Sequence, residues 1–154
     1  MERVQNEADL LLLNRQICFS LYAASNRLTR MYRSVLAEIG LTYPQYLVML
    51  VLWESTPQTV GSLGNRLHLD SGTLTPLLKR MEIAGVISRA RDRDDERRVV
   101  IELTAKGRKL RTKAAKVPET LGAGLKMKPE EIEVLRERVQ ALLASLAGTA
   151  TAAR

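Results

Sequence analysis

Apolar residues recur at three- and four-residue steps through the first quarter of the chain. The series starts at Leu10, Leu13 and Ile17 and continues to Val35 without a proline or glycine. Steps of this size place apolar side chains on one side of an α-helix. The pattern therefore predicts one long amphipathic helix over about residues 9–38, ending near Gly40.

Two shorter helices are predicted next. The first opens at Pro44 and runs through Trp53, because proline is favoured in the first turn of a helix. Its predicted core-facing residues are Tyr46, Leu47, Leu50 and Val51. The second covers residues 60–67.

A third helix leads toward Gly85, a residue type that commonly caps helix ends. A start at Asp70 or Ser71 places Pro76 inside this helix, where proline removes one hydrogen bond. Thr75 as the N-cap of a later start is the cleaner local choice. We prefer the earlier start and expect a distorted opening turn.

Beyond Gly85 the apolar residues change to the alternation of β-strands. One strand begins at residues 86–87, the charged run 92–96 forms a turn, and the returning strand carries Val99, Ile101 and Leu103. A helix is predicted from Thr104 through the lysine-rich segment, and a last one from Pro129 to about Leu146. The last helix has a heptad-like stripe of Ile132, Leu135, Val139, Leu142 and Leu146.

The order of these elements is that of a winged helix-turn-helix. We predict a mainly α fold with a small β-hairpin wing, in a single domain over residues 1–154. DNA binding is assigned to about residues 59–104. The first and last helices, about residues 9–38 and 129–147, offer apolar seams that need a partner. They predict a homodimer.

Charge supports nucleic acid as the partner. The net charge is +7, and residues 66–116 carry the whole excess, with fourteen basic and seven acidic side chains. We expect a palindromic site on double-stranded DNA, with the third short helix in a major groove. The residues assigned to this contact are Asp70, Ser71, Thr73, Thr75, Lys79 and Arg80.

The stretch from residue 70 to residue 107 resembles the recognition helix and wing of MarR-family regulators. Asp92, Asp95 and Arg97 match the D-x-x-D-x-R signature of that wing. The resemblance, which extends over about residues 11–146, implies that Arg97 enters the minor groove and that Asp95 steadies the wing. Arg93 stands where the family often has proline and adds charge at the tip.

Cys18 is the only cysteine, so it has no partner for an internal disulfide. A lone cysteine on an apolar helix is most often an inert small hydrophobe. Cys18 is predicted about two turns into the first helix, with Tyr22 on the same face. Tyr32 lies fourteen residues further on, roughly 21 Å along the helix. Only the Tyr32 of an antiparallel partner subunit would reach the sulfur, where its hydroxyl would stabilise the anion.

Residues 11–54 are similar to organic hydroperoxide resistance regulators within the MarR family. The resemblance implies that Cys18 is oxidised by organic hydroperoxides, and that Tyr32 and Tyr43 of the partner subunit form hydrogen bonds to its sulfur. It also implies a repressor that binds its operator when reduced and releases it when oxidised. With no second cysteine, the chain resembles the one-cysteine type, in which a small thiol captures the sulfenic acid or oxidation continues.

Two other functions compete with this interpretation. The first is a MarR-type repressor released by a small-molecule ligand, with a structural Cys18. The second is a thiol peroxidase, which is disfavoured because an enzyme needs no wing and the sequence has no other catalytic motif. We therefore expect no enzyme and no cofactor or metal. The apolar run 10–13 is far shorter than the roughly 18 residues of a membrane span, so we expect a cytoplasmic protein without membrane contact.

Overall fold

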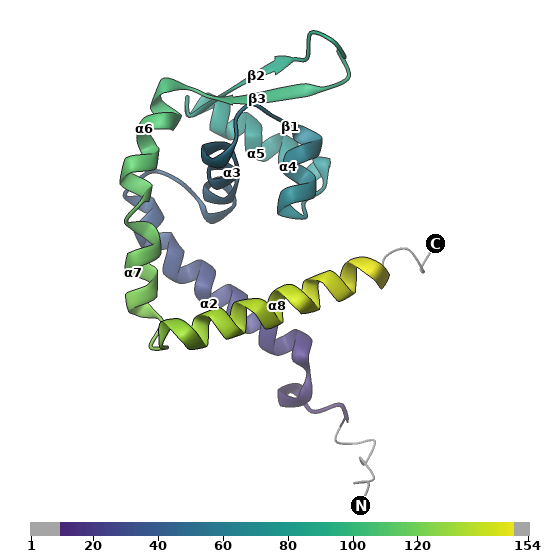
Figure 1. The fold of residues 1–154 in the computed structure, drawn as a ribbon, viewed down its shortest axis with the longest axis vertical. Helices are drawn as coiled ribbons and strands as arrows, with labels where there is room; N and C mark the ends of the chain where they lie inside the picture. The colour runs from purple at the N-terminus through teal and green to yellow at the C-terminus, as the bar shows by residue number, and fades with distance from the viewer. Residues whose placement is uncertain (1–9, 150–154) are drawn as a thin grey trace, which may run out of the picture. The chain divides into compact units, whose positions relative to one another are not determined.

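The computed structural model describes residues 10–149 and divides the chain into two compact units, residues 1–121 and 122–154. The first unit contains a three-stranded sheet with helices packed against it (Figure 1). Its elements are η1 (Leu13–Arg15), α2 (Ile17–Ala37), α3 (Tyr43–Glu54), β1 (Gln58–Thr59), α4 (Val60–Leu67), α5 (Ser71–Ile83), β2 (Ile87–Arg91), β3 (Val99–Leu103) and α6 (Ala105–Ala114). Helix α7 (Val117–Gly124) crosses the boundary, and α8 (Pro129–Thr149) belongs to the second unit. The predicted mainly α fold with a hairpin wing is confirmed.

The first long helix starts later than predicted. Gln16 has an extended backbone (φ −83°, ψ 110°) and separates the 3-10 turn η1 from α2. The apolar spacing in the sequence continues across this break and gives no sign of it. Cys18 is therefore the second residue of α2 and lies in its first turn, not two turns into the helix.

The buried side of helix α3 agrees only in part with the prediction. The amide of Thr42 donates to Oε1 of Gln45 at 2.9 Å and fixes the start of the helix. Tyr46 and Val51 are buried as predicted, whereas Leu47 is half-buried and Leu50 is exposed. The other buried residues of α3 are Val48, Met49 and Leu52. The error arises because α3 is apolar on every side and contacts α2, α4, α5, α6 and β3.

Helices α4 and α5 form the predicted helix-turn-helix. Helix α4 ends at Leu67, its C-cap His68 takes the left-handed conformation (φ 53°), and α5 starts at Ser71 with Asp70 as its N-cap. The earlier start of α5 is thus confirmed, with Pro76 inside the helix. Gly85 (φ 74°) supplies the positive φ that ends the helix before β2.

The wing hairpin belongs to a sheet with a third strand that was not predicted. Strand β2 pairs antiparallel with β3, with Ile87 opposite Leu103. On the other edge of β3 the two-residue strand β1 pairs through Gln58 and Ile101. Strand β1 is too short to show alternation in a sequence.

The helix through the lysine-rich segment ends earlier than predicted. Helix α6 stops at Ala114, and α7 begins at Val117, followed directly by Pro118. Proline in the first turn of a helix is favoured, so the sequence supports a new start here. No helix within residues 10–149 has the length and apolar character needed to cross a membrane.

Candidate functional site

One face of α5 is exposed and polar, and it carries most of the residues assigned to a nucleic-acid contact. Ser71, Thr73, Thr75, Lys79 and Arg80 are all exposed. On the opposite face, the helix buries Leu74, Leu77, Leu78 and Met81 in the core. The apolar side of α5 is therefore packed in the core, and its short polar side chains and two cations are exposed to a ligand.

Asp70 has a structural task at the start of α5. Its Oδ1 accepts from the amide of Thr73 at 2.8 Å, and its Oδ2 accepts from the Thr73 hydroxyl at 3.1 Å. These hydrogen bonds favour the carboxylate and lower the pKa of Asp70 below 3.8. The hydroxyl of Thr75 donates to the carbonyl of Ser71 at 2.7 Å, so its proton is also committed within the helix.

The tip of the wing is built by its aspartates. Oδ1 of Asp92 accepts from the amide of Asp94 at 2.9 Å, and Oδ1 of Asp95 accepts from the amide of Arg97 at 3.1 Å. Hydrogen bonds of this kind, from a backbone amide to the side chain two residues before it, stabilise tight turns. The side chains of Arg93 and Arg97 make no ion pair within residues 10–149 and are exposed.

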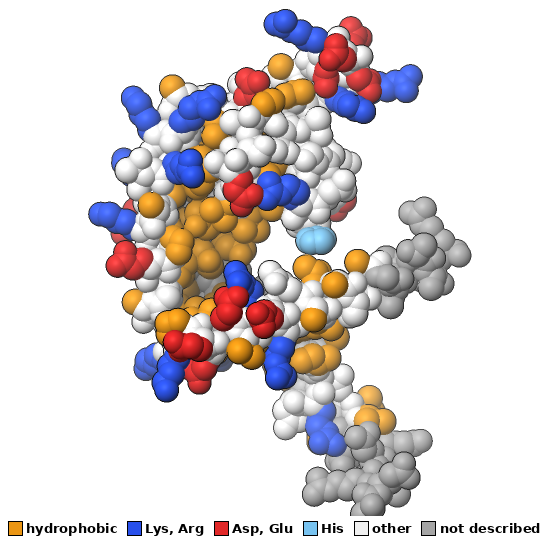
Figure 2. Space-filling model, viewed as in Figure 1, with side chains coloured by type: hydrophobic (Ala, Val, Ile, Leu, Met, Phe, Trp, Pro, Cys, Tyr) orange, Lys and Arg blue, Asp and Glu red, His pale blue; other side chains and the backbone are white. Residues whose placement is uncertain are grey.

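Within residues 66–116, where the sequence places the positive excess, most of that excess lies on α6 and not on the wing. Residues 91–98 of the wing hold four basic and four acidic side chains, so the tip is neutral overall, and Figure 2 shows both signs gathered there. Helix α6 instead carries five basic residues and no acidic one: Lys106, Arg108, Lys109, Arg111 and Lys113. The net positive charge therefore indicates an anionic partner but does not identify the wing as the surface that binds it. The case for the wing depends on its arginines and their geometry.

Cys18 is exposed in the first turn of α2. That turn contains no acidic residue, and the N-cap Gln16 makes no side-chain bond to it. The free amides at the start of a helix favour a negative charge nearby. Phe19 and Tyr22 are also exposed, so the thiol lies among apolar side chains on an open surface.

The tyrosine cluster, Tyr32, Tyr43 and Tyr46, joins α2 to α3. The ring centroids of Tyr32 and Tyr43 are 4.6 Å apart, and those of Tyr32 and Tyr46 are 5.9 Å apart. Burial raises the pKa of all three phenols above 10.0, and for Tyr32 the neighbouring Tyr43 and Tyr46 add to this. At neutral pH the three hydroxyls are therefore protonated and able to donate.

The structure brings together Tyr32 and Tyr43, but not Cys18 with either of them in one chain. Cys18 and Tyr32 lie fourteen residues apart on the same helix, roughly 21 Å. Sequence reasoning assigned Tyr46 to the core but missed its place in the tyrosine cluster and its contact with Trp53, whose ring centroid is 6.4 Å from that of Tyr46. Their seven-residue spacing, two helical turns, was the available signal.

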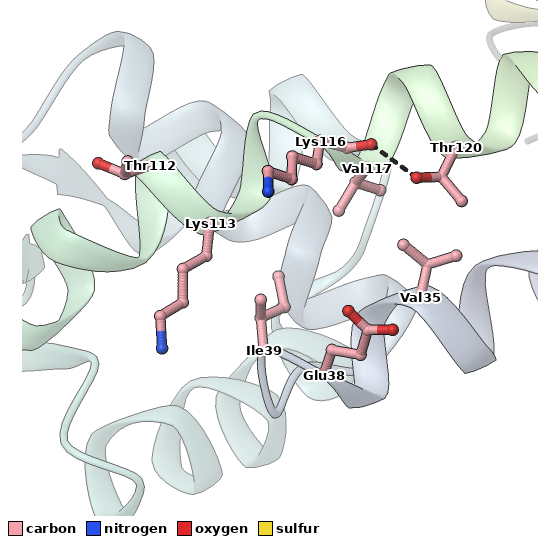
Figure 3. A pocket seen from close by; sticks show the side chains of 8 residues that line it. All are labelled: Val35, Glu38, Ile39, Thr112, Lys113, Lys116, Val117 and Thr120. Atoms are coloured by element: carbon pink, nitrogen blue, oxygen red, sulfur yellow. Dashed lines mark hydrogen bonds between the residues drawn. The ribbon is translucent and has the colours of Figure 1, made fainter.

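A cavity of about 390 Å³ opens between the end of α2 and the junction of α6 with α7. Figure 3 shows Val35, Ile39 and Val117 as its apolar lining, with Lys113 and Glu38 beside them. The Thr120 hydroxyl closes one side by donating to the carbonyl of Lys116 at 3.0 Å. The volume and the mixed lining suit a small amphipathic molecule with an anionic group.

Apolar side chains are exposed on both helices that were assigned to a dimer. In α2 they include Ile17, which is 65% exposed, Tyr22, which is 66% exposed, and Leu28, which is 38% exposed. Helix α8 exposes Val134, Leu135, Val139 and Leu143, and hydrophobic side chains are visible on its surface in Figure 2. Ile132 and Leu142, which belong to the predicted stripe, are half-buried.

Comparison with known proteins places these features in a family. Residues 30–113 match the family described as transcriptional regulator SarA/Rot. The organic hydroperoxide resistance transcriptional regulator of Bacillus subtilis is 44% identical over 93% of this chain and 97% of its own length. The regulator TtmR of Methylorubrum extorquens is 52% identical over 84% of this chain and 67% of its own.

The fold agrees with these relatives. The structures of reduced AbfR bound to DNA and of overoxidized AbfR bound to DNA each match with a TM-score of 0.74, over 92% of this chain and 99% of theirs. AbfR, from Staphylococcus epidermidis, is 36–38% identical in these matches. The relatives named above are transcriptional regulators rather than enzymes. Together these agreements show that the chain belongs to the MarR family of winged-helix transcriptional regulators.

Proposed function

We propose that the protein is a homodimeric repressor that binds a palindromic operator when Cys18 is reduced and releases it after an organic hydroperoxide oxidises Cys18. The likeness to a hydroperoxide regulator carries this proposal, and the exposure of the cysteine supports it. The chain is 44% identical, over 93% of its length, to an organic hydroperoxide resistance regulator, and its single cysteine is exposed at the start of α2.

The chemistry needs only the sulfur and two small co-reactants. The Cys18 thiolate attacks the peroxide, the O–O bond breaks, and a sulfenic acid forms while the alcohol leaves. A small cellular thiol then attacks the sulfenic sulfur, and a mixed disulfide forms with loss of water. Phe19 and Tyr22, exposed beside Cys18, provide apolar contact for the organic part of the peroxide.

The tyrosines act across the subunit interface. Tyr32 and Tyr43 form a ring pair that a single chain keeps far from its own Cys18. A two-fold axis that packs the α2 helices antiparallel brings this pair to Cys18 of the partner subunit. Because their hydroxyls are protonated at neutral pH, they donate to the sulfur. The exposed apolar residues of α2 and α8 supply the contact surface of the dimer.

Release depends on the size of the group added to Cys18. Overoxidized AbfR has been crystallised bound to DNA, so overoxidation does not by itself prevent binding in that relative. A mixed disulfide adds a whole thiol molecule and displaces the tyrosine pair. Displacement changes the distance between the two α5 helices, which must match two half-sites.

On DNA, α5 enters the major groove with Ser71 and Thr73 toward the bases, and Lys79 and Arg80 bind phosphates. Arg97 enters the minor groove from the wing, and Arg93 adds a contact at its tip. Asp95 steadies Arg97 through the turn that it closes. Asp70 and Thr75 contribute by shaping the start of α5.

A band-shift assay tests the proposal. The DNA is the region upstream of the protein's own gene, and the protein is treated with cumene hydroperoxide and a small thiol. We expect the wild type to release the DNA and the Cys18→Ser variant to bind as tightly as the reduced wild type and to remain bound. Serine keeps the shape of the side chain but has no oxidisable sulfur. Equal release by Cys18→Ser would eliminate Cys18 as the sensor.

A second function, release by a small ligand, is favoured by the cavity beside Lys113 and Glu38. In that case a small aromatic carboxylate such as salicylate would release DNA from Cys18→Ser as well as from the wild type. Lys113→Met should then weaken this ligand response without changing the response to peroxide. No ligand response in either protein would remove this alternative.

A further inference from the structure

Trp53 links the tyrosine cluster to the elements that carry the DNA-binding residues. Tyr46 and Trp53 are seven residues apart on α3, so two turns of helix place them on one side. Their ring centroids are 6.4 Å apart with an interplanar angle of 67°, an edge-to-face contact. The rings of Tyr32, Tyr46 and Trp53 therefore form a continuous series from α2 along α3.

At the other end of the series of rings, Trp53 makes a hydrogen bond to α6. Its indole Nε1 donates to the carbonyl oxygen of Gly107 at 3.0 Å. A helical carbonyl already accepts from the amide four residues on, but its oxygen has two lone pairs and accepts a second donor. This bond connects residues that are 54 positions apart in the chain.

Gly107 is in turn held against the end of α5 and the base of the wing. A Cβ atom at Gly107 would lie 2.0 Å from the carbonyl oxygen of Val86, so the two backbones are in direct contact. Thr104 strengthens the junction, because its hydroxyl donates to the carbonyl of Gly85 at 2.7 Å and its amide to that of Val86 at 3.2 Å. A displacement of Gly107 must therefore move the end of α5 and the start of β2.

We propose that Trp53 is a positioning residue that transmits a displacement of the tyrosine cluster to α5 and the wing through its hydrogen bond to Gly107. This inference rests on the proposed redox function and identifies how that function reaches the DNA. When a mixed disulfide on the partner's Cys18 displaces Tyr32 and Tyr43, Tyr46 loses its neighbour and shifts. The shift changes the edge contact with Trp53 and so the position of α6.

The first test separates oxidation from DNA release. Trp53→Phe keeps an aromatic ring beside Tyr46 and removes the N–H donor together with the part of the indole ring that carries it. Wild type and variant are oxidised with cumene hydroperoxide and a small thiol, Cys18 modification is followed by mass spectrometry, and operator affinity is measured by anisotropy of labelled DNA. We expect unchanged Cys18 oxidation and unchanged binding by the reduced variant. The ratio of the operator Kd of the oxidised variant to that of the reduced variant should be about fivefold smaller than the same ratio in the wild type, the effect of one hydrogen bond.

Tyr46→Phe is the matched control. It keeps the ring contact with Trp53 and removes a hydroxyl that makes no hydrogen bond within residues 10–149. Its Kd ratio should equal that of the wild type. If Trp53→Phe retains the full ratio, the proposed role of Trp53 is wrong while the redox function stands. If the wild type keeps its DNA with Cys18 fully modified, the redox function is wrong and the role of Trp53 with it.

A second measurement needs no variant at position 53. Trp53 is the only tryptophan, so emission excited at the long-wavelength edge of the indole band, where tyrosine does not absorb, reports on this one site. We expect the emission to change in step with Cys18 modification in the wild type and to remain constant in peroxide-treated Cys18→Ser. Constant emission in a wild type that releases its DNA would overturn the inference.

Discussion

Substitution of Gly107 by alanine should destabilise the protein strongly, although alanine is the better helix former. The new Cβ atom would lie 2.0 Å from the Val86 carbonyl oxygen and 3.2 Å from Cδ2 of Leu103. The backbones must separate by about 1 Å, because interiors are close-packed and have no room to absorb the methyl group. That movement breaks the bonds from Trp53 to Gly107 and from Thr104 to Val86.

The expected cost follows from these terms. Overpacking costs about 1–3 kcal/mol. The loss of two hydrogen bonds adds about 1–3 kcal/mol to this cost. The higher helix propensity of alanine offsets about 1 kcal/mol of it. The free energy of unfolding should therefore fall by about 3 kcal/mol, which corresponds to roughly 6–12 °C in Tm for a chain of this length.

Thermal denaturation followed by circular dichroism, at one protomer concentration, measures this change. Gly61→Ala is the matched control, because its Cβ would meet only Oγ1 of Thr59 at 3.9 Å in the first turn of α4. It should stabilise the protein by about 0.4–1 kcal/mol. A Gly107→Ala variant that melts with the wild type would refute the close contact between α6 and Val86.

Three further outcomes are expected. Arg97→Ala should cost about 1–3 kcal/mol of operator binding at matched salt. Arg108→Ala removes the same charge from α6 and should have a smaller effect. If both variants lose the same binding free energy, measured by fluorescence anisotropy of labelled DNA, Arg97 does not enter the minor groove. Light scattering at micromolar concentration should give the mass of a dimer, because α2 and α8 expose apolar side chains, and a folded monomer would contradict the cross-subunit site. The free energy of unfolding should decline as pH rises above 10.0, because the unfolded chain then loses phenol protons that the folded chain retains at its raised pKa values. Tyr43→Phe should weaken that decline in urea denaturation, and an unchanged slope would show that Tyr43 does not contribute.

Local signals in the sequence were sufficient for most of the helix-turn-helix and the wing, although Thr75 before Pro76 offered a second N-cap for α5 that the structure does not use. Asp70 caps α5 with its own side chain, and Gly85 ends it with a positive φ. Asp92 and Asp95 close the wing turn through bonds to amides two residues away. Each of these interactions spans only a few residues, so the residue type and its position predict it.

Other features of the chain depend on contacts with distant residues. The break at Gln16 interrupts an apolar series whose spacing gives no sign of it. Strand β1 exists because the free edge of β3 is there to pair with two residues. The buried side of α3 was predicted correctly for Tyr46 and Val51 but not for Leu50, because a helix that is apolar all round is oriented by the five elements around it.

The sequence by itself determined which residues carry the chemistry. A single cysteine, four tyrosines and the D-x-x-D-x-R run are chemical facts that need no coordinates. The tertiary structure alone decided how they are connected. The contact of Tyr32 with Tyr43, the bond from Trp53 to Gly107 and the approach of Gly107 to Val86 all join residues that are far apart in the chain. Such contacts leave no periodic pattern, because they form only when several helices pack at once.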